Sequence, residues 1–230
     1  MEIVPQVHQL PIRMTNVFLL VEDRITLVDT GYWGSTQRIV NFVQRLGRSP
    51  TDIDLIVVTH HHYDHTGSLA ELKALTGAKV AAHEDDAPFI RGEPFAPSHP
   101  SPKGLIPRLE ALALSIGHPK ATEVEIPLVD GQELDPLGGI RVIHTPGHTP
   151  GSICLHSPQR RLLIVGDALN HRRRLAFPPR MYSMDMAQAR QSVKRIAELE
   201  FDTLCFGHGQ AIIEGAAAMV QDLVNRSRLV

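Results

Sequence analysis

The 230-residue sequence has few cysteines, no excess of basic residues and no long apolar run. Its two cysteines, Cys154 and Cys205, are too few for a disulfide scaffold, and their apolar strand-like settings predict buried thiols. A net charge of −2 argues against a general nucleic-acid-binding protein. No apolar run approaches the roughly 20 residues of a membrane span, and no secretion signal is recognisable at the start. We therefore expect a cytoplasmic protein with neither nucleic acid nor membrane as a partner.

The spacing of apolar residues predicts strands and helices in alternation, as in a layered α/β fold. Expected strands span residues 16–21, 25–29, 53–59, 79–82, 140–144, 152–156, 161–165 and 203–206. Expected helices span residues 36–46, 68–76, 185–199 and 214–226, with Ser35 or Thr36 capping the first and Asp185 the third. This order suggests two similar halves packed face to face with helices outside, in a single domain over residues 1–230.

Residues 84–119 differ from the rest of the chain because they hold seven prolines. Such a stretch cannot form a central strand, and long irregular connections usually have a function or are disordered. We expect an inserted lid or rim here, with one helix at residues 108–116.

The segment His60-His61-His62-Tyr63-Asp64-His65 carries the strongest chemical signal. Its spacing would arise by chance only about 10⁻³ times in a chain of this length and histidine content. Alternating residues of an extended segment point the same way, so His60 and His62 can share one metal, and Asp64 and His65 can face another. Imidazole and carboxylate suit zinc, iron or manganese. The alternative is a histidine-rich surface loop or tag fragment, which the preceding buried strand and the interior aspartate disfavour.

Three more polar side chains follow predicted strands: His148, Asp167 and His208. Taken singly, a histidine or aspartate after a strand is usually a cap or turn residue. Together they occupy one edge of a predicted sheet, where open α/β sheets place their sites. Flanking glycines would let backbone and metal approach closely.

In these motifs and their order, the chain resembles the metallo-β-lactamase superfamily over nearly its whole length. Asp29-Thr30-Gly31 resembles the first family motif, and residues 60–67 resemble the second. His148, Asp167 and His208 resemble the third, fourth and fifth. The resemblance implies a four-layer αβ/βα sandwich of two mixed β-sheets with helices outside.

The resemblance also implies a dinuclear metal centre. One ion would be held by His60, His62 and His148, a second by Asp64, His65 and His208, and Asp167 would bridge them. Two divalent ions are expected, with zinc as the first choice and iron or manganese fitting the same ligands. Such a pair lowers the pKa of a bound water to about 7, and the hydroxide attacks a carbonyl carbon. Asp64, which would also help to move the proton, and Asp167 are the expected catalytic carboxylates.

The resemblance further points to a branch of the family. The namesake antibiotic hydrolases usually lack a bridging aspartate, so Asp167 disfavours β-lactamase activity, and His62 stands where diiron oxygen reductases have glutamate. We expect a small-molecule hydrolase of thioesters, lactones or related carboxyl esters, similar to glyoxalase II-like and lactonase-like enzymes. The extra helical domain that binds glutathione in full-length glyoxalase II is not visible. The alternatives are a persulfide dioxygenase with one iron on His60, His148 and Asp167, a β-lactamase, and a metal-binding protein without catalysis.

Three residues outside the ligand set are also candidates. Asp29 is expected to orient a ligand histidine through a hydrogen bond, or else to cap the helix that follows. Arg172, with its two arginine neighbours, would meet an acidic substrate or form a solvated basic loop. Tyr182 would donate a hydrogen bond to a substrate carbonyl. The histidines without a motif are expected to be surface or strand residues: His83, His99, His118, His144, His156 and His171.

Overall fold

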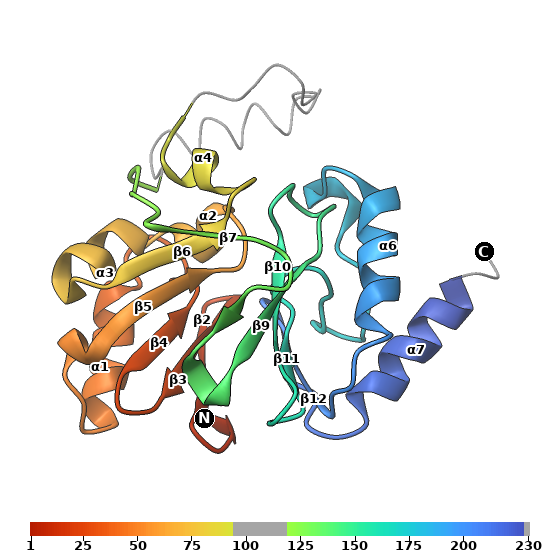
Figure 1. Cartoon of the computed structure of the whole chain (residues 1–230), viewed down its shortest axis with the longest axis horizontal. Helices are drawn as coiled ribbons and strands as arrows, with labels where there is room; N and C mark the ends of the chain where they lie inside the picture. The colour runs from red at the N-terminus through yellow and green to blue at the C-terminus, as the bar shows by residue number, and fades with distance from the viewer. Residues whose placement is uncertain (94–118, 228–230) are drawn as a thin grey trace.

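Two mixed β-sheets packed face to face form the centre of the protein, as a computed structural model shows for residues 1–93 and 119–227 (Figure 1). The first sheet has the order β1 (Glu2–Val4), β2 (Val7–Ile12), β3 (Thr15–Val21), β4 (Ile25–Val28), β5 (Ile53–Val58), β6 (Lys79–His83) and β7 (Ile126–Leu128). The second has the order β12 (Thr203–Cys205), β11 (Leu162–Ile164), β10 (Ile153–Ser157), β9 (Ile140–His144) and β8 (Glu133–Leu134).

Helices cover the outer face of each sheet, which confirms the expected αβ/βα sandwich (Figure 1). The first sheet carries α1 (Thr36–Arg45) and α3 (Leu69–Thr76), and the second carries α6 (Met186–Ile196) and α7 (Ala216–Ser227). Shorter elements lie in the connections: α2 (Tyr63–Thr66), α4 (Ala87–Ile90), η1 (Pro50–Asp52), η2 (Pro136–Gly138) and η3 (Arg180–Tyr182). Within residues 1–93 and 119–227, no helix combines the length and apolar character needed to cross a membrane.

The layered packing explains why several strands are apolar on both faces. Side chains alternate across a strand, so Val17 and Leu19 of β3 pack toward the helices while Phe18 and Leu20 pack between the sheets. The continuous apolar run of β5 has the same cause, because the strand pairs in parallel with β4 and β6 inside the sheet. The polar residues of these two strands, Thr15, Asn16 and Asp54, lie near the strand starts.

The two cysteines are free and buried, as predicted. Cys205 packs between the sheets, and Cys154 packs against the core beneath α6 and α7. Burial raises the pKa of each thiol to about 12. Neither thiol is therefore reactive at neutral pH.

Helices α1 and α6 begin where the sequence predicts, but only one of the two predicted capping hydrogen bonds forms. Asp185 caps α6 as predicted, because its carboxylate accepts hydrogen bonds from the backbone of residues 187 and 188. Ser35 precedes α1, but its hydroxyl donates to the Tyr32 carbonyl at 2.6 Å and accepts no cap hydrogen bond. The prediction of a side-chain cap at the start of α1 is thus wrong.

Strand β2, which contains Pro11, is not among the strands expected from the sequence. Proline cannot donate to a strand ladder, which argues against an interior strand. Only the first part of β2 pairs with β1, through Val7 and His8, so Pro11 needs no partner on that side. On its other side β2 pairs with β3 through a hairpin whose tip is Arg13-Met14. That hairpin reaches the functional site described below.

Most of the expected lid lies outside the described residues. This holds for residues 94–118, including the expected helix at 108–116 and the histidines at 99 and 118. The part before them forms α4, which begins after the buried Asp86. The lid therefore stays a prediction.

Candidate metal centre

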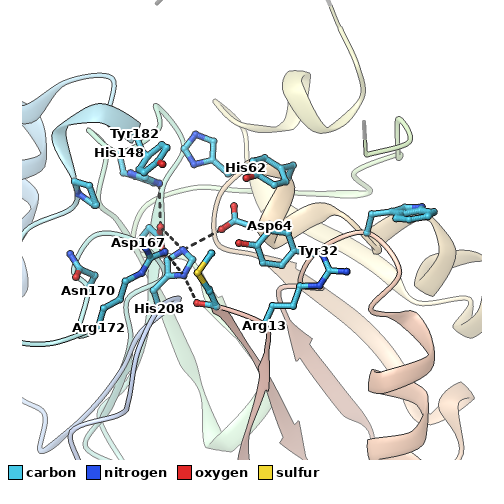
Figure 2. Close-up of a pocket in the computed structure, with 14 residues that line it drawn as sticks. Arg13, Tyr32, His62, Asp64, His148, Asp167, Asn170, Arg172, Tyr182 and His208 are labelled. Atoms are coloured by element: carbon cyan, nitrogen blue, oxygen red, sulfur yellow. Dashed lines mark hydrogen bonds and ion pairs between the residues drawn. The ribbon is translucent and has the colours of Figure 1, made fainter. Parts of the chain in front are cut away.

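The ends of four strands bring the predicted metal ligands to one place between the two sheets (Figure 2). His60 and His62 follow β5, and Asp64 and His65 lie in the short helix α2 directly after them. The others come from the second sheet, with His148 after β9, Asp167 after β11 and His208 after β12. Residues almost 150 positions apart in sequence thus share one pocket, which has a volume of about 440 Å³ and is lined by His62, Asp64, His148, Asp167 and His208.

The ligand atoms form three overlapping groups, in each of which the atoms lie within 4.8 Å of one another. These groups are His60, His62 and His148; Asp64, His65 and His208; and His60, His65 and Asp167. The first two are the two sets that the family resemblance implied. Asp167 lies between them: one of its oxygens is 3.5 Å from His148 Nε2 and 3.2 Å from His208 Nε2, and the other is 3.6 Å from His65 Nε2.

Several buried ligand atoms have no hydrogen-bond partner. They are the Nε2 atoms of His60, His65 and His148 and one carboxylate oxygen of Asp167. An unsatisfied buried polar group costs about 1–3 kcal/mol, so native proteins rarely leave several in one place. Divalent cations would satisfy all four atoms at once, and imidazole and carboxylate are ligands that such cations accept. The residues present therefore fit a metal centre.

The Nδ1 atoms of four ligand histidines have contacts with neighbouring oxygens, and these contacts direct the Nε2 atoms into the site. His60 Nδ1 lies 3.1 Å from Thr59 Oγ1, and His65 Nδ1 lies 2.7 Å from Asp29 Oδ2. His148 Nδ1 lies 3.2 Å from Ser183 Oγ, and His208 Nδ1 lies 2.6 Å from the Met14 carbonyl oxygen. Such contacts fix the tautomer and orientation of metal-binding imidazoles. Thr59, Ser183 and Met14 were not singled out in the sequence, because they belong to no recognisable motif.

Asp29 orients two of the ligand histidines, His60 and His65. Its carboxylate accepts hydrogen bonds from Thr59 N and Thr59 Oγ1, each at 2.8 Å, and from His65 Nδ1. Since Thr59 Oγ1 also contacts His60 Nδ1, the single carboxylate orients His65 directly and His60 through Thr59. Within the described residues, no hydrogen bond joins this carboxylate to the first turn of α1.

We predict that Asp29→Asn weakens metal binding by about 10–100-fold, because an amide cannot accept all three hydrogen bonds and His65 loses its orienting partner. Competition with a chromophoric chelator would measure the change. Asp54→Asn, at an exposed carboxylate paired with Arg24, is the matched control and should bind metal like the wild type. Unchanged affinity in Asp29→Asn would contradict an orienting role.

The protonation states at the site follow from burial and charge. Burial and the neighbouring imidazoles hold the pKa values of His60 and His62 well below 6.5, so both rings are neutral at pH 7 and can donate a lone pair. Burial opposes ionisation of Asp167, but His65 and its other histidine neighbours lower its pKa to about 2. Burial also opposes protonation of His65, yet Asp29, Asp64 and Asp167 raise its pKa to about 9. Without metal, the negative charges of the carboxylates and the positive charges of the protonated histidines thus offset one another.

Close packing at Gly207 leaves no room for a side chain beside these ligands. A Cβ atom there would lie 2.3 Å from an Asp167 carboxylate oxygen and 2.8 Å from His65 Cε1. The absence of a side chain at this position is therefore part of how Asp167 and His65 come together.

Asp86 joins the two ligand-bearing loops and was not foreseen. Its buried carboxylate accepts hydrogen bonds from His61 N at 2.8 Å, Thr149 Oγ1 at 2.8 Å and Gly151 N at 2.7 Å. Burial would raise its pKa, but His61 and these hydrogen bonds lower it to about 2. The loop that carries His60 and His62 is thereby tied to the loop that carries His148.

Four further histidines in the described part of the chain have other partners. His83 and His144 form a further group with Asp85, but their rings stack at 3.8 Å and 15°. His83 Nδ1 accepts from the Asp85 amide, and His144 Nε2 lies 2.8 Å from the Pro150 carbonyl oxygen. His156 and His171 likewise contact backbone carbonyls. Unlike the site histidines, these rings are satisfied without a cation.

The structure places both proposed substrate-contacting residues in the pocket. Tyr182, in η3, and Arg172, in the loop after β11, line it together with the ligands (Figure 2). Tyr182 is 47% exposed, so its ring remains available to a bound molecule. Arg172 Nη2 lies 3.1 Å from His208 Nδ1. The neighbouring Arg173 and Arg174 are exposed and do not line the pocket.

Comparison with known proteins agrees with this geometry. The sequence pattern of the Metallo-beta-lactamase superfamily matches residues 10–208. A probable metallo-hydrolase of Bacillus subtilis, YflN, is 29% identical over 221 residues, covering 88% of this chain and 83% of that protein. A hydroxyacylglutathione hydrolase of Pseudomonas aeruginosa is 31% identical over 150 residues, covering 64% of this chain and 44% of that protein.

Solved structures share the fold. A metallo-β-lactamase family protein of Thermus thermophilus superimposes with a TM-score of 0.71 at 24% identity, over 98% of this chain and 80% of that one. A subclass B3 metallo-β-lactamase of Bradyrhizobium japonicum gives 0.70 at 21% identity, over 100% and 92% of the two chains. With its sandwich fold, its strand-end ligands and a family match that runs from β2 to His208, the chain belongs to the metallo-β-lactamase superfamily.

Proposed function

We propose that this protein is a metal-dependent hydrolase that cleaves a thioester, lactone or related carboxyl ester of a small molecule. The observation that carries the proposal is the set of unpartnered ligand atoms around Asp167, at the base of an open pocket. A site that only stored metal would not need a pocket of this size beside the ligands.

The donor set suits two divalent ions, with zinc as our choice. His60, His62 and His148 would hold one ion, Asp64, His65 and His208 would hold the other, and Asp167 would contact both. When bound, such ions supply a hydroxide at neutral pH and polarise a carbonyl oxygen.

The chain's own residues have separate roles around this centre. Asp64 lines the pocket, accepts a hydrogen bond from Thr15 Oγ1 at 3.3 Å and can take a proton from the attacking water. Tyr182 donates a hydrogen bond from its phenol to a substrate carbonyl. The buried His60 and His65 keep bulk water from the far side of the site.

The hydroxyacylglutathione hydrolase relative, which by its name acts on a thioester, supports the choice of substrate. Because this chain spans less than half of that protein, glutathione itself is not part of the proposal. Asp167 argues against a β-lactam substrate, because the antibiotic hydrolases after which the family is named usually lack a bridging aspartate.

The test combines a metal count with a substrate panel. We expect about two equivalents of divalent metal per tag-free chain and turnover of aryl thioesters or lactones, but not of a chromogenic β-lactam. One equivalent of iron with oxygen uptake on a persulfide would instead indicate the dioxygenase. Bound metal without turnover of any ester would indicate a metal-binding protein, and β-lactam turnover alone would indicate a lactamase.

A further inference from the structure

Two arginines reach the mouth of the pocket from opposite halves of the chain. Arg13 lies at the tip of the β2–β3 hairpin, and Arg172 lies in the loop after β11 (Figure 2). Both line the pocket that contains the ligands, and Figure 2 shows them on either side of His208. Neither belongs to the ligand set, so the hydrolytic chemistry does not explain their presence.

The backbone at Arg13 is strained. Its φ is 57°, in the left-handed region that glycine and asparagine adopt most readily. Hairpin tips with such a φ usually carry glycine, asparagine or aspartate. An arginine here costs free energy, and strained residues that persist at a site suggest a function for the side chain. The Arg13 guanidinium packs 5.5 Å from the Tyr32 ring centroid, at the wall of the pocket.

Neither guanidinium is neutralised by the protein. Within residues 1–93 and 119–227, no carboxylate lies within 4.0 Å of Arg13 or Arg172, whereas other arginines such as Arg48, Arg161 and Arg195 have carboxylate partners. The contact of Arg172 with His208 Nδ1 does not supply an acceptor. When the Nδ1 proton of His208 is donated to the Met14 carbonyl oxygen at 2.6 Å, that nitrogen has no lone pair for Arg172.

Both charges act on the same wall of the pocket. Burial and the Asp64 carboxylate raise the pKa of Tyr32, while the charges of Arg172 and Arg13 oppose the rise. Two cations with unfilled donors beside one cavity attract an anion, and guanidinium groups match carboxylate and phosphate oxygens in pairs.

We propose that Arg13 and Arg172 form an anion-binding subsite that selects ester substrates carrying a carboxylate or phosphate group away from the scissile bond. This inference rests on the proposed hydrolase function for its substrate chemistry. The arginines contact the charged group and set specificity, and they take no part in bond cleavage.

Matched thioesters test the subsite and locate the charge. S-phenyl thioacetate is neutral, S-(4-carboxyphenyl) thioacetate carries a charge in its leaving group, and the S-phenyl monothioester of succinate carries one in its acyl group. We expect Arg172→Ala and Arg13→Gly to lower kcat/KM for at least one charged substrate tenfold or more, mainly through KM. The neutral substrate should change less than threefold, and Arg173→Ala, outside the pocket, should behave like the wild type.

Arg13→Gly also separates specificity from structure. Glycine relieves the positive φ, so this variant should unfold at a higher temperature than the wild type while discriminating less between charged and neutral substrates. A parallel loss with all three substrates, or full retention of the preference for charge, would overturn the proposal.

A binding measurement keeps the subsite distinct from hydrolysis. Trp33, the only tryptophan in the sequence, lines the pocket and can report ligand binding by fluorescence. The metal-loaded protein should bind 3-phenylpropane-1-sulfonate at least tenfold more tightly than 3-phenylpropan-1-ol, and both arginine variants should lose this difference. If the preference is found but no ester is hydrolysed, the proposed function fails and the subsite stands. Equal binding of the two probes in the wild type would refute the subsite.

Discussion

Replacing His62 with alanine is expected to lower kcat/KM for the ester substrate by at least about 10³-fold, because an ion that loses one of its three histidine ligands would no longer supply an activated water. The variant should also retain about one metal equivalent fewer per chain. His62 is the informative ligand to remove. It lines the pocket, whereas His60 is almost fully buried, so that the loss of His60 would also leave a cavity in the core.

The matched control is His8→Ala. His8 is a half-buried histidine on β2 whose ring packs near that of Phe42 and which does not line the pocket. It should keep full metal content and activity. Elemental analysis and initial-rate kinetics on both variants would measure the effect. Wild-type turnover by His62→Ala, with a normal metal count, would remove His62 from the centre and with it the assignment of the first metal.

Removing the metals with a chelator is expected to lower the melting temperature by roughly 15 °C or more. A ligand present at 1,000 times its Kd stabilises the folded state by about 4 kcal/mol, and each kcal/mol shifts Tm by about 2–4 °C in a chain of this length. Two ions should therefore have a large combined effect. In their absence the unpartnered atoms of His60, His65, His148 and Asp167 remain buried and unsatisfied.

Titration of zinc back into the metal-free protein would measure how many ions each chain binds. Recovery of Tm should be complete near two equivalents, and His62→Ala should recover a smaller part of the shift. Calcium, which prefers oxygen ligands, is the matched control ion and should restore little. Recovery that is complete at one equivalent would contradict the two-ion site, and a Tm indifferent to chelation would contradict a metal centre altogether.

The part of the site that lies in one segment could be read from the sequence. His60, His62, Asp64 and His65 are adjacent in the chain, and a buried strand directly before them places them at a sheet edge. His148, Asp167 and His208 are each weak signals alone. Their assignment depended on the order of motifs in the family resemblance, and folding brings them to the same pocket from the second sheet.

Residues whose role depends on packing could not be read in this way. Asp85 and Asp86 are neighbours of the same type, yet the side chain of Asp85 is 52% exposed and Asp86 is buried at 1%, where it joins two loops. Arg13 lies in a turn without the usual glycine or asparagine, and the strand before this turn was not predicted because it contains Pro11. His83 and His144 stack although 60 residues separate them in the chain.

The alternation of strands and helices, the layered architecture and the donor types available for metal follow from the amino-acid sequence alone, because periodicity and residue chemistry are local properties. The packing of the folded chain, in contrast, sets which aspartate is buried and which hydrogen bonds orient the histidines. It also brings two arginines, from a hairpin tip and a distant loop, to one pocket. Those outcomes depend on contacts between segments far apart in the chain, which no local pattern encodes.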